Sequence, residues 1–366
     1  MPSQELLMTI ITDISIWFVL YLIVTIALNL QYGYTGIPNF GMVLSVAGGA
    51  YVTGTLAGRI ARLYYNVGTD LDFVQDSAKI ASMVNDRLAT DPVGGIVLFL
   101  LMIVIAMLIT AFLGFIVSYP SIRVREVYLM MVLIAAGEAI RIVGENYYPL
   151  VGGTTWVQVP NVFIWLGDAQ RVVVSVLFVG IALFVSFVVQ RVVDSPFGRL
   201  IRAVRENETV VESLGKDTVR IRMLVFVLGS AIASLAGVLY AFYSHAVMAT
   251  AFTRDAWTFL PWLMLMLGGK GNNKGTLAGT AVIIVVRRLI MIFKYEIQQF
   301  VPVEAIWLEL LLMSGFLIFI MIYRPEGLIA ERPIRIRGVD YQDIADASSR
   351  RGESNEDGQW VEWQLE

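Results

Sequence analysis

DSPFGRLIRAVRENETVVESLGKDTVRIRM, residues 194–223, is the longest strongly charged segment that precedes the C-terminal tail of this chain. Six basic residues and three glutamates are distributed over it: Arg199, Arg202, Arg205, Lys216, Arg220 and Arg222, with Glu206, Glu208 and Glu212. Its apolar residues recur at helical spacing, and Gly215 stands where a helix would end. Long apolar runs flank it on both sides. The segment therefore predicts one or two short amphipathic helices in a loop, and its basic character is typical of a cytoplasmic loop.

The composition on either side indicates a membrane protein. Of the 366 residues, 57% are hydrophobic and 16% are charged, which lies far from the averages of soluble domains. The chain has no cysteine and one histidine, His245, so we expect no disulfide framework, no cysteine nucleophile and no metal site. A net charge of −3 gives no indication of a nucleic-acid partner. The fold class is predicted to be an all-α polytopic bundle of about eight spans, with a range of eight to ten.

The apolar runs place the spans along the chain. The predicted spans are Ile14–Leu30, Ile37–Gly58, Val93–Val117, Val127–Val143, Val172–Gln190, Leu224–Tyr243, Leu277–Phe293 and Ala305–Tyr323. The stretch Ala256–Leu267 contains Pro261 and is shorter than the ~20 residues of a straight crossing, so we expect it to be extended by its flanks or broken. Small residues recur four apart in the second and sixth spans, which favours close helix packing.

Two segments are expected to lie outside the bilayer besides the charged loop. Residues 59–92 form a polar insertion in which apolar residues keep a three-to-four spacing, and Asp70 and Asp72 suit a helix N-terminus, so an amphipathic helix is predicted on the outer surface. Residues 331–366 are acidic and polar and are predicted to be a disordered cytoplasmic tail after a permease domain of residues 1–330.

The distribution of Lys and Arg sets the orientation. With the charged loop inside, the inner loops and tail hold 17 basic residues and the outer loops hold 7. This bias agrees with the positive-inside rule. It places the N-terminus outside and the C-terminus in the cytoplasm of a multi-pass cell-membrane protein.

One glycine-rich stretch resembles a nucleotide loop only superficially. In LGGKGNNKGT, residues 267–276, Lys274 precedes Gly275, whereas a Walker A motif places its Lys directly after the last Gly, between a strand and a helix. We therefore expect no nucleotide site here, and a tight cytoplasmic turn instead.

Charged residues inside predicted spans are candidates for a polar pathway, because each costs ~2.5 kcal/mol or more at the bilayer centre. Glu138 and Arg141 are three apart and share a helix face, and Glu309 lies in the last span. These three residues are predicted to line a translocation pathway. The alternative is that they pair with one another or extend to the interface, which we consider the better explanation for Arg287 and Arg288.

Four motifs occur in order and together resemble the permease subunits of branched-chain amino acid ABC transporters, the LivM-type half. They are LNLQYGYTGIPNFGMVLSVAGGAYVTG (28–54), SPFGRLIRAVRENETVVESLG (195–215), LGGKGNNKGTLAG (267–279) and YRPEGLI (323–329). The resemblance covers most of the chain and implies an ABC importer permease fold of the type II-like class. Met42 stands where family members commonly have His.

The resemblance also implies partners. These are a second homologous permease of the LivH type, two cytoplasmic ATPase subunits that hold the ATP-Mg, and an extracellular or periplasmic solute-binding protein, with membrane lipids around the spans. No cofactor is expected on this chain. The region that resembles the coupling helix, which fits a groove of an ATPase, comprises Arg205, Glu206, Asn207, Glu208, Glu212, Ser213, Leu214 and Gly215. Relatives carry branched-chain amino acids, other amino acids, urea or short amides.

Two other functions remain open from the residues themselves. A self-sufficient secondary transporter or channel for a small polar solute favours broken helices and paired acidic residues. A membrane enzyme needs a cluster of His, Cys or carboxylates at one depth, and the sequence does not indicate one. The expectation is therefore a transport subunit without an ATPase site of its own.

Overall fold

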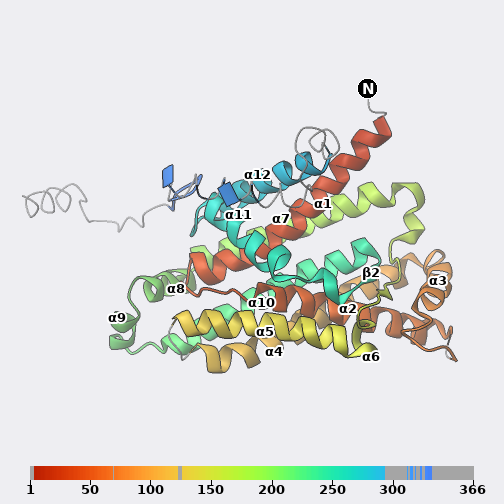
Figure 1. Cartoon of the computed structure of the whole chain (residues 1–366), viewed down its shortest axis with the longest axis horizontal. Coiled ribbons are helices and arrows are strands. Elements are labelled where there is room, and N and C mark those ends of the chain that lie inside the picture. Colours follow the sequence, from red (N-terminus) through yellow and green to blue (C-terminus); the bar gives the residue numbers. More distant parts are fainter. Residues whose placement is uncertain are drawn as a thin grey trace, which may run out of the picture. The chain divides into compact units, whose positions relative to one another are not determined.

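The structure is a computed structural model that describes residues 4–68, 70–122, 126–292, 311, 314, 315, 318, 322, 323 and 326–331. These residues belong to one compact unit, residues 1–331, and most of them are helical (Figure 1). Among them the strands are limited to β1 (Val157–Gln158) and β2 (Ala246–Val247), which pair antiparallel with Val157 opposite Val247. The predicted all-α class is confirmed.

Within the described residues, six helical segments are long and apolar enough to cross a membrane. They are α1 (Gln4–Leu28) with the π-helix η1 (Asn29–Gly33), α4 (Pro92–Ser121), α5 (Glu126–Asn146), α7 (Gln170–Asp194) with the 3-10 helix η2 (Ile164–Ala169), α10 (Thr218–Ser244) and α12 (Asn273–Ile292). A seventh long helix, α2 (Met42–Tyr65), has more small and polar residues. The prediction of about eight spans agrees roughly with this set, and the last predicted span, 305–323, lies mostly outside the described residues.

Several helices extend beyond the apolar runs that predicted them. The sixth span was predicted to begin at Leu224, whereas α10 begins at Thr218, directly after Asp217, whose carboxylate accepts a hydrogen bond from the Arg220 N–H (3.0 Å). The backbone hydrogen bonds of a helix form through charged residues as readily as through apolar ones, and the helix begins where a capping side chain satisfies its first free N–H groups. Hydropathy therefore locates a span and the cap decides where its helix starts.

α2 and α10 approach each other very closely. A Cβ on Gly237 would lie 1.9 Å from the carbonyl oxygen of Val46, and a Cβ on Gly49 would lie 2.1 Å from that of Ser234. No side chain fits in either space, so glycine is required for this contact. The predicted close packing of these small residues is confirmed at Gly237 and Ala50, whereas Gly54 and Gly58 of the predicted series face Val247 and Phe73.

The chain leaves helical geometry between α1 and α2. Residues 35–41 follow η1 without regular structure, and α2 begins at Met42, five residues later than the predicted span. Asn39 lies in this break, where its side-chain amide donates to the Gln31 side chain (2.8 Å). Polar side chains thus replace some of the backbone hydrogen bonds that a continuous helix would make.

The second irregular region was predicted to be extended by its flanks or broken; its backbone stays helical, and we call it a break because its α-helical hydrogen-bond pattern is interrupted. The stretch that was too short to cross forms a π-helix, η4 (Asp255–Phe259), and the nine-residue α11 (Leu260–Gly268). The two breaks contact each other. The Trp262 indole N–H donates to the Asn39 carbonyl (2.9 Å), and the Val43 N–H donates to the Thr258 hydroxyl (3.1 Å). Two interrupted helices therefore meet inside the bundle.

The polar insertion contains the helix α3 (Ser77–Leu88), whose apolar face buries Ile80, Val84 and Leu88. The predicted N-terminal boundary of the insertion was wrong, because residues 59–65 continue α2, whereas its C-terminal boundary agrees with the start of α4 at Pro92. The helix also begins later than Asp70 and Asp72 suggested, because Asp72 caps a separate turn before α3. Its carboxylate accepts from the N–H groups of Val74 and Gln75 (both 2.9 Å). Those N–H groups of Gln75 and Val74 lower the pKa of Asp72.

The charged segment, residues 194–222, contains α8 (Pro196–Glu206) and α9 (Glu208–Ser213) between α7 and α10. The prediction of one or two short helices is confirmed. This segment lies at the opposite end of the unit from α3, α6 (Tyr148–Val151) and the β1–β2 pair (Figure 1). The 3-10 helix η3 (Ala249–Ala251) follows β2.

Candidate functional site

The charged segment has two well-capped helices. Ser195 accepts from the Gly198 N–H (3.4 Å) at the start of α8, and Asn207 accepts from the Val210 N–H (3.1 Å) at the start of α9. Such caps satisfy backbone donors that a helix start leaves free. α8 buries Gly198, Ile201 and Val204 against the spans, so its position relative to the membrane helices is held by apolar contacts.

The end of α9 forms an exposed projection. Leu214 is 74% exposed and Val210 is 54% exposed, and the acidic Glu206 and Glu212 and the basic Lys216 around them are also exposed. Gly215 has φ +73, a conformation that glycine adopts without strain. Apolar side chains surrounded by charged ones are the composition of a protein-binding surface. Leu214 is among the predicted coupling residues, whereas Val210 is not.

The other predicted coupling residues hold α9 in place. Glu208 forms an ion pair with Arg222 of α10 (3.1 Å), and Glu212 accepts a hydrogen bond from the Thr218 hydroxyl (2.7 Å). Ser213 donates back to the Thr209 carbonyl (2.9 Å) within the helix. These contacts link α9 to the first turn of the spanning helix α10.

Arg205 points away from the exposed projection. Its guanidinium donates to the Gly33 carbonyl oxygen and forms ion pairs with Glu206 and Glu331 (both 2.9 Å). Burial lowers the pKa of Arg205, but the bonds to Glu206 and Glu331 outweigh burial and raise that pKa above its ordinary value. The group is therefore always charged, and it contacts three parts of the chain.

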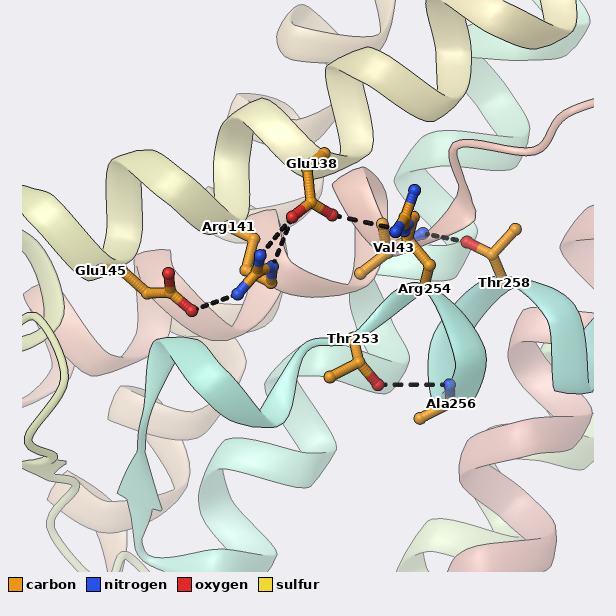
Figure 2. Close-up of polar contacts among 8 residues, drawn as sticks. All are labelled: Val43, Glu138, Arg141, Glu145, Thr253, Arg254, Ala256 and Thr258. Carbon is orange, nitrogen blue, oxygen red and sulfur yellow. Dashed lines mark hydrogen bonds and ion pairs between the residues drawn. The ribbon is translucent and has the colours of Figure 1, made fainter. Parts of the chain in front are cut away.

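A second polar group, which we call the α5 cluster, consists of Glu138, Arg141, Glu145 and Arg254 (Figure 2). Arg141 donates to Glu138 through Nε (3.0 Å) and pairs with Glu145 through Nη1. The other Glu138 oxygen faces Arg254 at 3.4 Å. Three members lie on successive turns of α5, and Arg254 comes from the segment before η4. Of the three charged residues predicted to line a pathway, the structure brings Glu138 and Arg141 together.

The α5 cluster is partly open to the surface of the unit. The exposed fractions of its side chains range from 20% for Glu145 to 47% for Arg254. Thr258 and Val43 lie next to it, at the contact between the two helix breaks (Figure 2). The cluster thus places alternating charges beside interrupted helices, in a part of the chain that is otherwise apolar.

Sequence reasoning missed two members of the α5 cluster. Glu145 is four residues after Arg141, and the helical i,i+4 rule would have found it. Arg254 had been assigned to an outer loop, and no local signal relates it to Glu138. Glu309, the third predicted pathway residue, lies outside the described residues.

The two adjacent arginines of α12 lie elsewhere. Arg287 donates to the Tyr21 hydroxyl (3.0 Å), and Arg288 forms an ion pair with Asp13 (2.9 Å). Asp13 also accepts from the Tyr243 hydroxyl (2.6 Å). These contacts agree with the alternative that the charged residues of the spans pair within the protein.

The remaining candidates do not form a chemical site. Among the described residues, no group of three or more His, Asp or Glu side chains is placed to hold a metal ion. His245 follows α10 with φ +54 and is half-buried, and its Nδ1 has no hydrogen-bond partner. The LGGKGNNKGT turn packs against its own chain. The N–H groups of Leu328 and Ile329 donate to the carbonyls of Leu267 and Gly268 (2.8 and 3.0 Å).

Comparison with known proteins gives consistent results. Residues 10–321 match the family model described as branched-chain amino acid transport system, permease component. A probable branched-chain amino acid transport permease protein LivM of Methanocaldococcus jannaschii is 38% identical over 331 residues, which are 89% of this chain and 94% of that protein. The LivM proteins of the high-affinity systems of Salmonella typhimurium and Escherichia coli are each 25% identical over 87% of this chain and 69% of theirs. No solved structure matches the chain.

Proposed function

The chain belongs to the permease family of branched-chain amino acid transport systems, and from this premise we propose that it is the pathway-forming subunit of an ATP-driven importer. In this proposal, two separate cytoplasmic ATPase subunits hold the ATP-Mg and the chain itself carries no ATPase site. A second, LivH-type permease and an extracellular or periplasmic solute-binding protein complete the transporter. The solute is a branched-chain amino acid or a related small polar molecule, such as another amino acid, urea or an amide.

The observation that carries this proposal is the projection at the end of α9. Val210 and Leu214 are exposed there although the rest of the segment is polar or packed, and α9 is tied to the spanning helix α10 through Glu208 and Arg222. A partner that binds Leu214 is therefore connected to the membrane part by a short, hydrogen-bonded path. This arrangement supports an ATPase as the partner, because such a partner has to move the spans as well as bind them.

The proposed orientation follows from the same region. With α8 and α9 in the cytoplasm, the inner segments hold 17 of the basic residues against 7 outside. The N-terminus is then outside, the C-terminus is inside, and residues 59–92 lie on the receptor side.

The α5 cluster is proposed to line the solute pathway. Charged side chains that are one-fifth to one-half exposed cannot face lipid without a large free-energy cost, so this side of α5 is expected to face water and the second permease. The alternating carboxylates and guanidinium groups can interact with both the ammonium and the carboxylate group of a zwitterionic solute. We place Glu309 on the same pathway as a prediction from its sequence position.

The proposal is tested at Leu214 in the assembled transporter. Replacing Leu214 by Asp should reduce ATPase binding by about tenfold or more, as expected for an apolar anchor of an interface, and uptake should fall with it. Leu63 is a matched control, because it is 73% exposed at the opposite end of the unit. Leu63→Asp should leave ATPase binding unchanged. Normal binding and uptake by Leu214→Asp would contradict the assigned docking role.

The helix breaks beside the α5 cluster favour one alternative, a secondary transporter that works alone. The purified chain in vesicles distinguishes the two. We expect no solute accumulation under an ion gradient without the partner subunits, and accumulation by the chain alone would support the alternative.

A further inference from the structure

Arg205 lies between the exposed projection at the end of α9 and the membrane-spanning helices. It is the penultimate residue of α8, and Asn207, the cap of α9, follows two residues later. Its side chain is 21% exposed, whereas that of the neighbouring Glu206 is 71% exposed. Of the two adjacent charged residues, Glu206 is exposed and Arg205 is held against the end of the first span.

One end of the guanidinium binds the broken connection between α1 and α2. Nη1 donates to the carbonyl of Gly33, the last residue of η1. Gly36 has φ +79 and lies so close that a Cβ on it would be 3.2 Å from Cγ of Arg205. Arg205 therefore contacts the chain on both sides of the point where the first span ends and the non-helical residues 35–41 begin.

The other end binds the segment that follows the last span. Nη2 pairs with Glu331 at 2.9 Å. Residues 328–330 are attached to the turn between α11 and α12, through the two backbone bonds described above and through the Asn272 amide, which donates to the Ala330 carbonyl (3.0 Å). Gly271 of this turn lies against Glu331, where a Cβ would be 2.6 Å from the carboxylate.

The α11–α12 turn is also connected to η1 directly. Asn29 accepts from the Gly271 N–H and donates to the Asn273 side chain, both at 2.9 Å. The end of the first span, the turn and residues 326–331 thus form one hydrogen-bonded body. Two charged side chains of α8 contact this body within the part of the chain that the structure describes. Arg202 lies 5.1 Å from the Tyr34 ring centroid, and Arg205 binds the body through a hydrogen bond and an ion pair.

We propose that Arg205 is a positioning residue that transmits movement of α8 and α9 to the two interrupted helices of the bundle. The inference rests on the proposed function, since it presumes that an ATPase moves α9. η1 leads into the first break, residues 35–41, and the turn leads back through α11 to the second. These two breaks contact each other at Asn39 and Trp262. A displacement of Arg205 is therefore applied to both breaks at once.

Arginine is suited to this role because its planar fork binds a carbonyl and a carboxylate in fixed directions at the same time. A lysine at this position retains the charge but has a single nitrogen, and so cannot hold both groups in that geometry. Arg205→Lys therefore tests whether the positive charge alone is sufficient or whether simultaneous binding of Gly33 and Glu331 is required. Glu331→Gln removes the ion pair with Glu331 and leaves the bond to Gly33 and the ion pair with Glu206.

The test uses the assembled transporter and measures solute imported per ATP hydrolysed. In Arg205→Lys and Arg205→Ala the solute-to-ATP ratio should fall by about tenfold, a typical size for the coupling between two sites, and any decrease in ATPase binding should be much smaller than this. Glu331→Gln should show a smaller decrease. Arg199→Ala is the matched control, because Arg199 is an exposed arginine of the same helix, and its ratio should equal that of the wild type.

A second readout follows movement itself. The chain has no cysteine, so cysteines introduced at the exposed positions Thr209 of α9 and Lys274 at the start of α12 can carry a pair of spin labels. A third label on the ATPase gives the distance to each of these two labels. When ATP is added to the wild type, the distances to the ATPase and the label-to-label distance should change in constant proportion to one another. In Arg205→Lys these changes should no longer be proportional.

Several outcomes would overturn the inference. A normal solute-to-ATP ratio in Arg205→Ala would do so, and so would parallel loss of ATPase binding and uptake in Arg205→Lys, which would make Arg205 a docking residue. Failure of the proposed function looks different, because then Leu214→Asp leaves ATPase binding unchanged. If Arg205→Ala does not fold, the comparison of Arg205→Lys with Glu331→Gln and Arg199→Ala still decides the question.

Discussion

The α5 cluster and the charged segment contain the same kind of ion pair in different surroundings. Arg141 pairs with Glu138 on α5, and Arg220 pairs with Asp217 at the start of α10, each three residues apart. The side chains of the first pair are 28% and 25% exposed, and those of the second are 83% and 49% exposed. In water each charge of the second pair is solvated without its partner, whereas on the apolar helix α5 each charge depends on the others.

The largest effect is therefore expected from Arg141→Ala. This change leaves Glu145 without its guanidinium partner and Glu138 with Arg254 alone, in a helix that we treat as membrane-spanning. An unpaired charge there costs ~2.5 kcal/mol or more, so we expect a clear decrease in thermal stability and loss of uptake. Thermal unfolding of the purified chain and uptake by the assembled transporter measure the two effects.

Arg220→Ala is the control for this prediction, since it breaks the exposed pair of the same spacing. Its unfolding temperature should be close to that of the wild type, because exposed ion pairs contribute little to stability. If Arg141→Ala and Arg220→Ala lowered the unfolding temperature equally, the difference in exposure between the two ion pairs would have no effect on stability.

A smaller and more local effect is expected from Asn207→Ala. The substitution removes the side-chain cap of α9, which typically costs about 1 kcal/mol, while the apolar contacts of α8 remain. Hydrogen exchange of the α9 amides should become faster, and exchange in α5 should not change. Asn207→Ser, which restores a capping oxygen, should return the wild-type exchange rates, and faster exchange throughout the chain would contradict a local role.

The smallest effect concerns a half-buried group without a partner, His245. Burial lowers its pKa, so the unfolded state binds a proton more readily once the pH falls below about 6.5. The stability of the wild type should therefore decrease as the pH is lowered from 7 towards the pKa of His245 in the folded state. Above pH 7 His245 is neutral in both states and makes no such contribution.

His245→Asn tests this prediction, because Asn tolerates the positive φ at this position. The variant should lose less stability between pH 7.5 and 5.5 than the wild type does, as measured by thermal unfolding. Asp72→Asn is a control, since the lowered pKa of Asp72 keeps its titration below this window. An identical pH profile for His245→Asn and the wild type would rule out the contribution.

Much of the charged segment was accessible to sequence reasoning, and much of the α5 cluster was not. Leu200, Ile201 and Val204 recur at helical spacing, and α8 indeed buries Ile201 and Val204. The pair Glu138–Arg141 was found in the same way. Arg254 was not, because it approaches Glu138 only through the packing of η4 against α2 and of η3 against α5. The late start of α2 was also missed, because Ile37, Phe40 and Met42 continue an apolar run across the break.

The sequence by itself determined the membrane class of the protein, the approximate position of its long helices and the amphipathic helices of the charged segment. These properties depend on apolar periodicity and on hydrogen bonds between residues at most four apart. Only the tertiary structure decided that Arg205 faces Gly33 and Glu331 rather than a partner, that the two interrupted helices meet, and that Glu138 receives a second arginine. Each of these contacts joins residues more than a hundred positions apart, and their approach depends on how whole helices pack, which the glycines of α2 and α10 set through the close contact of two backbones.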